Sequence, residues 1–430
     1  MDDQWLVPHF EKMLYDNALL ALAYAHAFSL TREPRYQQIA EKTLDFMQQE
    51  LAHHEGGFYA SLDADTPDGE GRYYAYTYQE LEKFLSGEQF RFLNRITTIR
   101  KQGNFENELN ILQLSGDPAV LSQDLGIHPK ELQSKLSDIF SLLNSKRAER
   151  TKPRRDKKVI AAWNALAVRA FAESGLILDR EDYQETAIRS ISFLLEELRS
   201  ADGHLFRSWS QGKTSYPGTL QDYAGMILAL NAVYQINFSS EYYLLMGELY
   251  RIMTAEFSSD GNLYYDTAAS INNLIVRPQS LQDNVVPSGN SLTAHAHWLF
   301  SNYEHKQEVE ETIGNMLAII HTQAQKYPTS FGYWLQVADK NSQSGTQVAL
   351  ISKSDINSVK PFLDIYRKEF RPYAVVGVKL GDHIQEHALP GILLDRPSIN
   401  GEPTAYVCHN FICMRPTVDP EIFQEQVEDN

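Results

Sequence analysis

Apolar residues recur along much of the chain at the three- and four-residue spacing of one helix face. In residues 19–27 and 36–47 two such stripes flank the polar stretch Thr31–Pro34, a pattern that predicts two antiparallel helices joined by a short turn. Three later pairs of segments repeat it: 160–175 with 183–198, 222–235 with 241–257, and 288–303 with 308–324. The chain is therefore predicted to contain a series of helical hairpins.

Each predicted hairpin leads into a glycine-containing turn followed by aromatic residues. Glycine permits a tight helix exit, and the aromatic residues favour an extended strand. The turns are Glu55–Tyr59, Asp202–Phe206, Asp260–Tyr265 and Ser330–Trp334. Repeated hairpins either stack into an open array or close into a ring, and the long connections after each second helix favour closure. We therefore expect a mainly helical α/α toroid.

Two segments depart from this repeat. Residues 78–155 begin as a helix and end in the basic run 146–155, so we expect a helical insertion whose basic run is either an anion site or a solvated surface. Beyond residue 346 the pattern changes to a strand at 348–351, a helix at 354–370 and a strand at 373–378, a small β–α–β unit. The predicted domains are a toroid over 1–345, with the insertion at about 78–155, and a C-terminal extension over 346–430 packed on it.

Composition and charge narrow the class of protein. The 430 residues are 43% hydrophobic and 22% charged, which is typical of a globular chain. The formal net charge of −17 disfavours nucleic acid and anionic membranes as partners. The sequence shows no apolar run near the roughly 18 residues of a membrane span, its start lacks a leader pattern, and two cysteines cannot build a disulfide framework. We therefore expect a cytoplasmic protein.

The first cluster of candidate functional residues lies where the first predicted helix begins. His9, Glu11, Tyr15 and Asp16 follow Pro8, which fixes the entry of the chain, and Glu11 and Tyr15 can share one helix face. These side chains could line a binding site. The alternative is that acidic residues in a first helical turn only offset the helix dipole, with His9 on the surface.

The second cluster is an acidic window around Asp63 and Asp65. If the chain folds back across the mouth of a ring, carboxylates here could supply a general acid and a general base for glycosidic or sugar-proton chemistry. The window lacks the terminal glutamate and flanking helices of a calcium loop. A polar hairpin turn is the alternative structural interpretation.

The third cluster is spread over the first helices of the later hairpins. Trp163, Asn164, Asp222, Tyr223 and Asn290 each lie near the start of such a helix. In a closed ring these helices form the inner layer, so we expect their N-terminal ends to meet around one pocket. The alternative is N-capping, which uses the same polar residue types but does not require the aromatic ones.

The two cysteines flank a histidine near the C-terminus. Cys408, His409 and Cys413 provide one C-x₄-C pair, which is half a zinc site and not the C-x-x-C of a redox centre. Buried structural thiols are therefore the favoured interpretation. We expect neither a metal nor a cofactor, and the glycines form no nucleotide-binding pattern.

Ordered motifs along the chain resemble the spermatogenesis-associated, thioredoxin-domain-containing protein family. The motifs are Val7–Asn17, Gly56–Tyr59, Asp63–Asp65, Glu70–Tyr74, Trp163–Asn164, Gln221–Tyr223, Pro287–Ser291 and Tyr406–Cys408. The resemblance implies an α/α toroid of the six-hairpin glycosidase type, related in architecture to N-acylglucosamine 2-epimerases. Family members also carry an N-terminal thioredoxin-like domain and a further hairpin. The resemblance therefore implies a truncated or split member with an incomplete ring.

Analogy with these folds implies a carbohydrate-active protein, either a hydrolase or epimerase-like, with a small-molecule sugar substrate in an acidic and aromatic pocket. Asp63, Asp65 and Asp222 are then the catalytic candidates. The predicted substrate-binding residues are His9, Glu11, Tyr15, Asp16, Trp163, Asn164, Tyr223 and Asn290. The alternative is a non-catalytic interaction module that works with a separate thioredoxin-like domain.

Overall fold

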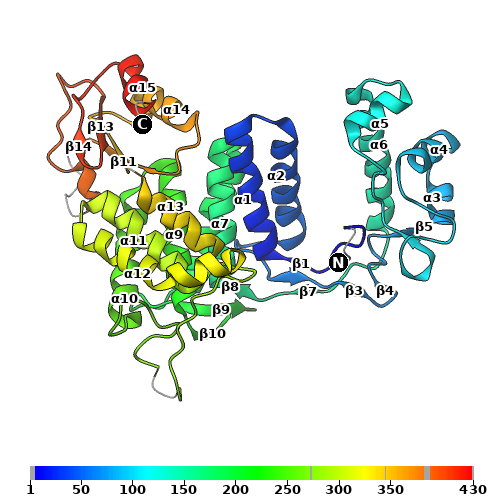
Figure 1. Ribbon diagram of the computed structural model, residues 1–430, viewed down its shortest axis with the longest axis horizontal. Coiled ribbons are helices and arrows are strands. Elements are labelled where there is room, and N and C mark those ends of the chain that lie inside the picture. Colours follow the sequence, from blue (N-terminus) through cyan, green and yellow to red (C-terminus); the bar gives the residue numbers. More distant parts are fainter. Residues whose placement is uncertain (1–4, 272–273, 344, 382–387, 429–430) are drawn as a thin grey trace. The chain divides into compact units, whose positions relative to one another are not determined.

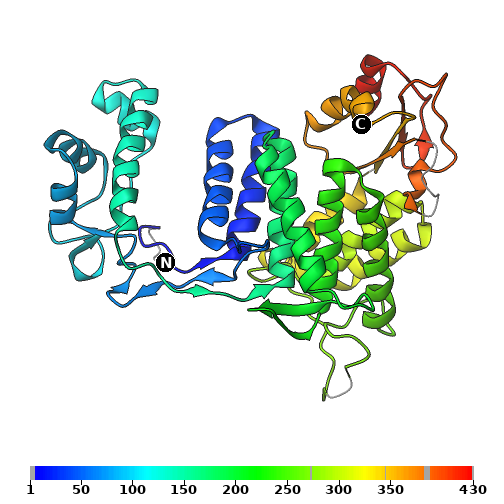
Figure 2. The same cartoon turned by 180° about the vertical axis from the view of Figure 1, so that it is seen from behind.

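The computed structural model describes residues 5–271, 274–343, 345–381 and 388–428. Its contacts divide the chain into two compact units: the described part of Met1–Met13 with Ser61–Asp156, and Leu14–Ala60 with Lys157–Asn430. Figures 1 and 2 trace both units from opposite sides. Within the described residues, every helix is too short or too polar to cross a membrane.

The first unit combines short antiparallel strands with four helices. Strands β1 (Lys12–Met13), β2 (Ser61–Leu62) and β7 (Arg155–Asp156) form one sheet; β3 (Asp65–Thr66) pairs with β4 (Gly69–Glu70), and β5 (Tyr76–Thr77) with β6 (Leu109–Asn110). The helices are α3 (Tyr78–Phe84), α4 (Gly87–Ile96), α5 (Pro118–Leu125) and α6 (Pro129–Ala148). Capping boxes at Thr77 with Glu80 and at Ser86 with Gln89 explain why α3 and α4 begin there. Apolar side chains of α3, α4 and α6 form this unit's core.

The second unit confirms the four predicted hairpins. They are α1 (Leu14–Thr31) with α2 (Pro34–Phe46), α7 (Ala161–Ile177) with α8 (Glu181–Glu197), α9 (Leu220–Asn237) with α10 (Ser240–Phe257), and α11 (Gly289–Glu304) with α12 (Gln307–Lys326). A π-helical turn, Met47–Leu51, continues α2. The proline at the start of α2 fits a first helical position, where its missing N–H costs no hydrogen bond.

The first helix of each hairpin belongs to the inner layer. α1 packs on α7, α7 on α9, α9 on α11, and α11 on α13 (Gly332–Ser342) (Figure 1). Residues 289–303 of α11 are buried throughout, whereas α8, α10 and α12 bury one stripe and expose the other face. A helix that is apolar on all sides must be covered on all sides, so the outer helices complete the burial. This is the predicted α/α toroid architecture of helical hairpins.

Three of the four glycine-containing turns have the predicted extended form. Their aromatic or apolar residues pair with the preceding helix end at Ala52–Phe58, Arg199–Leu205 and Ser258–Tyr264. In the second turn the chain continues into the hairpin of β9 (Phe206–Ser210) and β10 (Lys213–Pro217), and β9 also pairs with β8 (Val159–Ile160).

The fourth turn differs from the prediction. Gly332 and Tyr333 do not begin a strand; they begin helix α13. The reason is Asp283, whose Oδ2 accepts hydrogen bonds from the backbone N–H groups of Tyr333 at 2.8 Å and Trp334 at 3.3 Å. A carboxylate in this position satisfies the free N–H groups of a first helical turn and favours the helix dipole.

The C-terminal part confirms the predicted small α/β unit. Strand β11 (Thr346–Ser352) runs parallel to β12 (Ala374–Leu380), with α14 (Lys360–Arg367) between them, as a β–α–β unit requires. β11 also pairs antiparallel with β13 (Thr404–His409), and β14 (Ile412–Cys413) forms the edge, giving the order β12-β11-β13-β14. Helix α15 (Pro420–Glu428) packs on α14 and β13.

The prediction that the two cysteines are buried structural thiols is wrong. Cys408 and Cys413 form a disulfide across β13 and β14, where they are direct cross-strand partners. Cys408 is buried, but Cys413 is exposed. The sequence spacing alone did not reveal that a tight hairpin turn places the two residues opposite each other.

Candidate functional site

The second unit contains a cavity of about 580 Å³ between its inner helices. Its walls come from α1, α7, α9, α11 and α13, mainly from the middle and C-terminal parts of these helices, and from residues 366–375, which run from the end of α14 to the start of β12. This volume falls in the range of small-molecule sites. The cavity is therefore the candidate site.

A chain of hydrogen-bonded polar side chains lines this cavity. His26 Nε2 lies 2.8 Å from Glu173 Oε2, and Arg169 Nε donates to Glu173 Oε1 at 2.6 Å. Arg169 Nη1 donates to the Tyr333 hydroxyl at 2.8 Å, and that hydroxyl lies 2.7 Å from His295 Nδ1. Helices α1, α7, α13 and α11 thus contribute one connected network.

The hydrogen-bond pattern constrains which nitrogen of each histidine carries hydrogen. A carboxylate only accepts, so His26 donates through Nε2, and Nδ1 is the acceptor nitrogen of its neutral ring. The Tyr333 hydroxyl accepts from Arg169 and can give its own hydrogen to His295 Nδ1. In the neutral ring, His295 then carries hydrogen on Nε2.

Burial and charge set the protonation of the network. Burial opposes ionisation of Glu173, but the Arg169 guanidinium and the His26 hydrogen bond together hold the pKa of this carboxyl well below its usual value. Burial, with Lys340 and Arg169 adding to it, lowers the pKa of His295 well below its usual value. At neutral pH the site therefore holds an ionised glutamate and a neutral His295.

Lys340 adds a second cation to the cavity. Its ammonium donates to the carbonyl of Pro372 and lies 4.6 Å from the centre of the Trp298 ring. Burial, followed by the repulsion of Arg169, lowers its pKa to about 8. Among the described residues, no carboxylate oxygen lies within the 4.0 Å of an ion pair with Lys340. Its charge is therefore available to a ligand.

A second polar wall faces the cavity from α9. Gln235 Nε2 donates to the hydroxyl of Tyr303 at 2.9 Å, and that hydroxyl donates to Asn231 Oδ1 at 2.9 Å. Phe370, in the segment after α14, packs against the ring of His26 with centroids 4.6 Å apart. The cavity thus combines amide groups, aromatic rings and charges, as a site for a polar small molecule requires.

Four predicted site residues belong to the first unit. His9 is exposed, and its Nε2 lies 3.4 Å from Glu11 Oε2. Asp63 and Asp65 are exposed at the start of the β3–β4 hairpin, where Asp63 Oδ1 accepts from the Asp65 backbone N–H at 3.3 Å. This is the polar hairpin of the alternative interpretation, and the catalytic roles of both carboxylates stay predictions.

Three other predicted residues join the three later hairpins to the turns before them. Asn164 Oδ1 accepts from the backbone N–H of Phe58 at 2.6 Å, and its Nδ2 donates to the Phe58 carbonyl at 3.0 Å. Asn290 makes the same pair of bonds with Tyr264, at 2.8 and 2.9 Å. The Tyr223 hydroxyl accepts from the backbone N–H of Leu205 at 2.9 Å. We call these three sets of bonds the turn clasps.

The remaining predicted residues lie in the first turns of the inner helices. Asp222 is buried and closes a capping box with Thr219, while its Oδ1 accepts from the backbone N–H of Ala162 at 2.9 Å. Tyr15 and Trp163 meet edge to face, with ring centroids 4.7 Å apart. Asp16 lies in the first turn of α1. None of the predicted residues lines the cavity described above.

Sequence reasoning missed the residues that do line the cavity. Arg169 and Glu173 are four residues apart on a helix that is otherwise almost wholly apolar, and His295 lies in a helix buried throughout. Charged or imidazole groups at such positions are costly to bury unless they are paired. Ionisable residues at these buried helix positions were therefore the sequence signal that could have indicated the site.

One group in the described part has the geometry of a metal site. His53, His54 and Glu55 place one ligand atom each within 4.8 Å of one another. His54 and Glu55 are exposed, and the ring nitrogens of His53 and His54 lie 3.9 and 4.0 Å from Glu55, as in surface ion pairs. We assign no metal to this group.

Comparison with known proteins places the chain near one named group. It is 27% identical over 457 residues to human Spermatogenesis-associated protein 20, a match that covers 97% of this chain and 58% of that protein. The chain thus spans 58% of the length of this curated relative. Its mouse counterpart is 26% identical with the same coverage. No protein-family model matches the chain.

Two solved structures of sugar epimerases match part of this chain, both with TM-scores below 0.5. The cellobiose 2-epimerase of Spirochaeta thermophila has a TM-score of 0.42 at 13% identity, covering 69% of this chain and 53% of that one. A sugar epimerase from a ruminal bacterium has a TM-score of 0.44 at 11% identity, covering 73% and 61%. The predicted partnership with a thioredoxin-like domain stays a prediction.

Proposed function

We propose that this protein binds a reducing sugar in the cavity of the second unit and moves a proton between positions next to its carbonyl group, as a sugar isomerase or epimerase does. The observation that carries the proposal is the connected network from His26 through Glu173, Arg169 and Tyr333 to His295 within a cavity of about 580 Å³.

Such a reaction needs a base that removes a proton from carbon and a group that stabilises the resulting oxyanion. His26 is the base in this proposal, because Glu173 holds the ring by Nε2 and Nδ1 is left to accept the proton. The oxyanion would be met by the cations of Arg169 and Lys340 and by the Nε2–H of His295. Returning the proton to the other carbon gives an isomer, and returning it to the opposite face of the same carbon gives an epimer.

The same network disfavours hydrolysis by Glu173. A glycosidase needs one carboxyl group that stays protonated near neutral pH to act as the general acid. Glu173 has the opposite character, because Arg169 and His26 keep its pKa low. The hydrolase alternative would therefore need carboxylates outside this network.

Deuterium exchange tests the proposal directly. Free and phosphorylated aldoses and ketoses are incubated with the protein in D₂O, and proton NMR follows the hydrogens at carbons 1 and 2. We expect deuterium at one of these carbons for at least one reducing sugar, and none for the corresponding methyl glycoside, which cannot open to its carbonyl form.

Two variants give the controls. Glu173→Gln should lower the exchange rate by about 100-fold or more, because it leaves His26 without its orienting carboxylate. Glu256→Gln is the matched control, since Glu256 also binds a histidine, His204, at 2.8 Å but does not line the cavity. Absence of exchange with every reducing sugar would refute the proposal. Hydrolysis of a glycoside that is lost in Asp63→Asn or Asp65→Asn would favour the hydrolase instead.

A further inference from the structure

The disulfide lies in an exposed hairpin on the edge of the C-terminal sheet. Cys408 on β13 faces Cys413 on the edge strand β14. Cys408 has 1% of its surface exposed, whereas Cys413 is exposed to solvent. An incoming thiol can therefore reach only the sulfur of Cys413 without opening the sheet.

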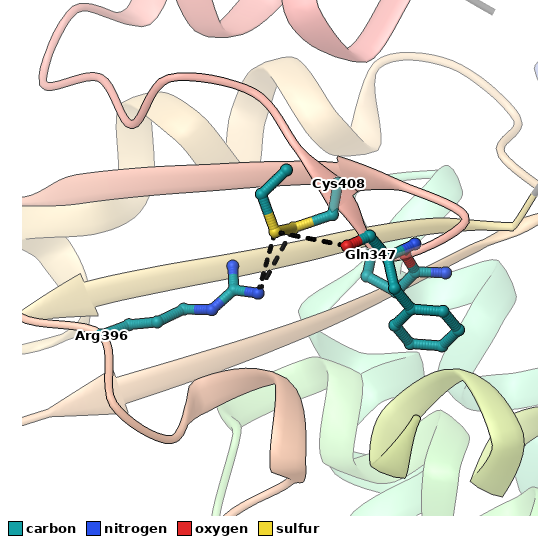
Figure 3. Close-up of a disulfide and its surroundings, with 5 residues drawn as sticks. Gln347, Arg396 and Cys408 are labelled. Atoms are coloured by element: carbon teal, nitrogen blue, oxygen red, sulfur yellow. Dashed lines mark hydrogen bonds between the residues drawn. A yellow bond between two sulfur atoms is a disulfide. The ribbon is translucent and has the colours of Figure 1, made fainter. Parts of the chain in front are cut away.

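A cation lies directly beside both sulfurs. Figure 3 shows the Arg396 side chain extending toward the disulfide, and its Nη2 is 3.3 Å from Cys408 Sγ and 3.4 Å from Cys413 Sγ. The guanidinium also lies 5.1 Å from the centre of the Tyr406 ring. Its Nη1 is buried without a hydrogen-bond partner. Among the described residues, Arg396 forms no ion pair with a carboxylate.

This cation fits the reduced cysteines better than the oxidised pair. A disulfide is neutral and a weak acceptor, so it compensates little of the cost of burying a guanidinium. A thiolate is a full negative charge, and an adjacent arginine favours its formation. Stabilising the thiolate stabilises the reduced state, which makes the disulfide a stronger oxidant.

The surrounding contacts keep the two cysteines together after reduction. The backbone N–H of Phe411, in the turn between them, donates to Gln347 Oε1 at 3.0 Å, and Gln347 Nε2 donates to Asn302 Oδ1 at 2.8 Å. The Phe411 ring stacks on His305 with centroids 3.8 Å apart. None of these contacts involves sulfur, so the turn stays in place and the thiols remain close enough to oxidise again.

We propose that Cys408 and Cys413 form a reversible thiol–disulfide exchange centre, with Cys413 as the attacked sulfur and Arg396 as the group that stabilises the departing Cys408 thiolate. The thiolate of a small thiol reductant attacks Cys413 Sγ, the bond between the two cysteines breaks, and its electron pair leaves with Cys408 Sγ. A second reductant thiolate attacks the reductant sulfur of this mixed disulfide and releases the Cys413 thiolate. Two cysteines are thereby reduced, and two reductant thiols are oxidised to their disulfide.

Redox titration of the full chain tests this centre. The protein is equilibrated with graded ratios of reduced to oxidised glutathione, and free thiols are alkylated and counted by mass spectrometry. We expect reversible reduction with unchanged circular dichroism. Arg396→Gln should require a ratio roughly tenfold more reducing for half-reduction, because the thiolate loses its adjacent charge. Arg396→Lys, which keeps the charge, should shift the ratio less.

Arg277→Gln is the matched control, since Arg277 also lies over a tyrosine ring, 4.1 Å from the centre of Tyr265, and is expected to leave the ratio unchanged. An equal half-reduction point in wild type and Arg396→Gln would overturn the proposal. So would a disulfide that opens only when the protein unfolds.

A second measurement needs no substitution. The rate at which iodoacetamide alkylates Cys413 in the reduced protein is followed against pH. We expect a midpoint clearly below the value of about 8.5 for an ordinary cysteine. A midpoint at or above that value would contradict the assigned role of Arg396.

Discussion

Glu173 lies one helical turn beyond Arg169 on α7, and the two side chains bind through Glu173 Oε1 and Arg169 Nε at 2.6 Å. The other carboxylate oxygen is bound by His26. One carboxylate thus joins a cation from its own helix to an imidazole from α1, within the wall of a cavity.

Glu173→Gln should destabilise the protein by about 2 kcal/mol, because it leaves a largely buried guanidinium without its counter-charge. Urea unfolding measures the loss. Glu256→Gln should cost less than about 1 kcal/mol, since its partner His204 has 41% of its side chain exposed and water screens that pair. Equal losses in the two variants would show that the Arg169 pairing contributes little.

Stability should fall as pH decreases from about 6.5 to 4, and His297 should account for part of the decrease. Burial lowers the pKa of His297 to about 4, between the hydroxyls of Tyr250 and Tyr264. In this range the unfolded chain binds a proton that the folded chain excludes, so stability rises with pH, by roughly 3 kcal/mol for this one group. His297→Gln should flatten the dependence measured by urea unfolding between pH 4 and 7. An unchanged slope would show that this histidine is protonated in the fold.

The cavity lysine should titrate far below a surface lysine. Burial and the nearby Arg169 lower the pKa of Lys340 to about 8. Burial, followed by the repulsion of Arg147, also lowers the pKa of Lys12 to about 8. Reductive methylation with ¹³C-formaldehyde, followed by NMR, should therefore show two dimethyl-lysine signals with midpoints near this value, and Lys340→Arg should remove one of them. If the signal lost in Lys340→Arg titrates near 10.5, the ammonium is more solvated than the structure indicates.

The turn clasps predict a structural phenotype for two residues that the sequence suggested as ligand contacts. Asn290→Ala should cost about 2 kcal/mol, because it leaves the N–H and carbonyl of Tyr264 buried without that partner. It should leave intact the rise in melting temperature caused by a sugar that binds the cavity. Asn164→Ala should have the same effect, because it leaves the N–H and carbonyl of Phe58 without their partner. If a folded variant no longer shows the sugar-induced rise in melting temperature, both residues belong to a binding site as the sequence suggested.

The spacing of apolar residues was sufficient to predict the inner and outer helices, because it indicates which faces of each helix are buried. It was insufficient for α13, since the aromatic run Phe331–Trp334 favours a strand and the deciding carboxylate, Asp283, lies some fifty residues earlier. The disulfide could not be predicted either, because it depends on the register in which β13 and β14 pair, and the local spacing of the two cysteines does not give that register. Asn164 and Asn290 were predicted from the sequence as substrate-binding residues, and only the structure shows that they bind the backbone of the preceding turn.

The turn clasps also determine where the polypeptide tolerates a new pair of ends. Each clasp is a hydrogen-bonded link between the start of one hairpin and the loop that leaves the previous hairpin. New chain ends in that loop would therefore disrupt the link between neighbouring repeats. Relocated termini, as in a circular permutant, should therefore be accepted more readily between the paired helices, for instance at Asp179 between α7 and α8, than in the turns at Phe58 or Tyr264.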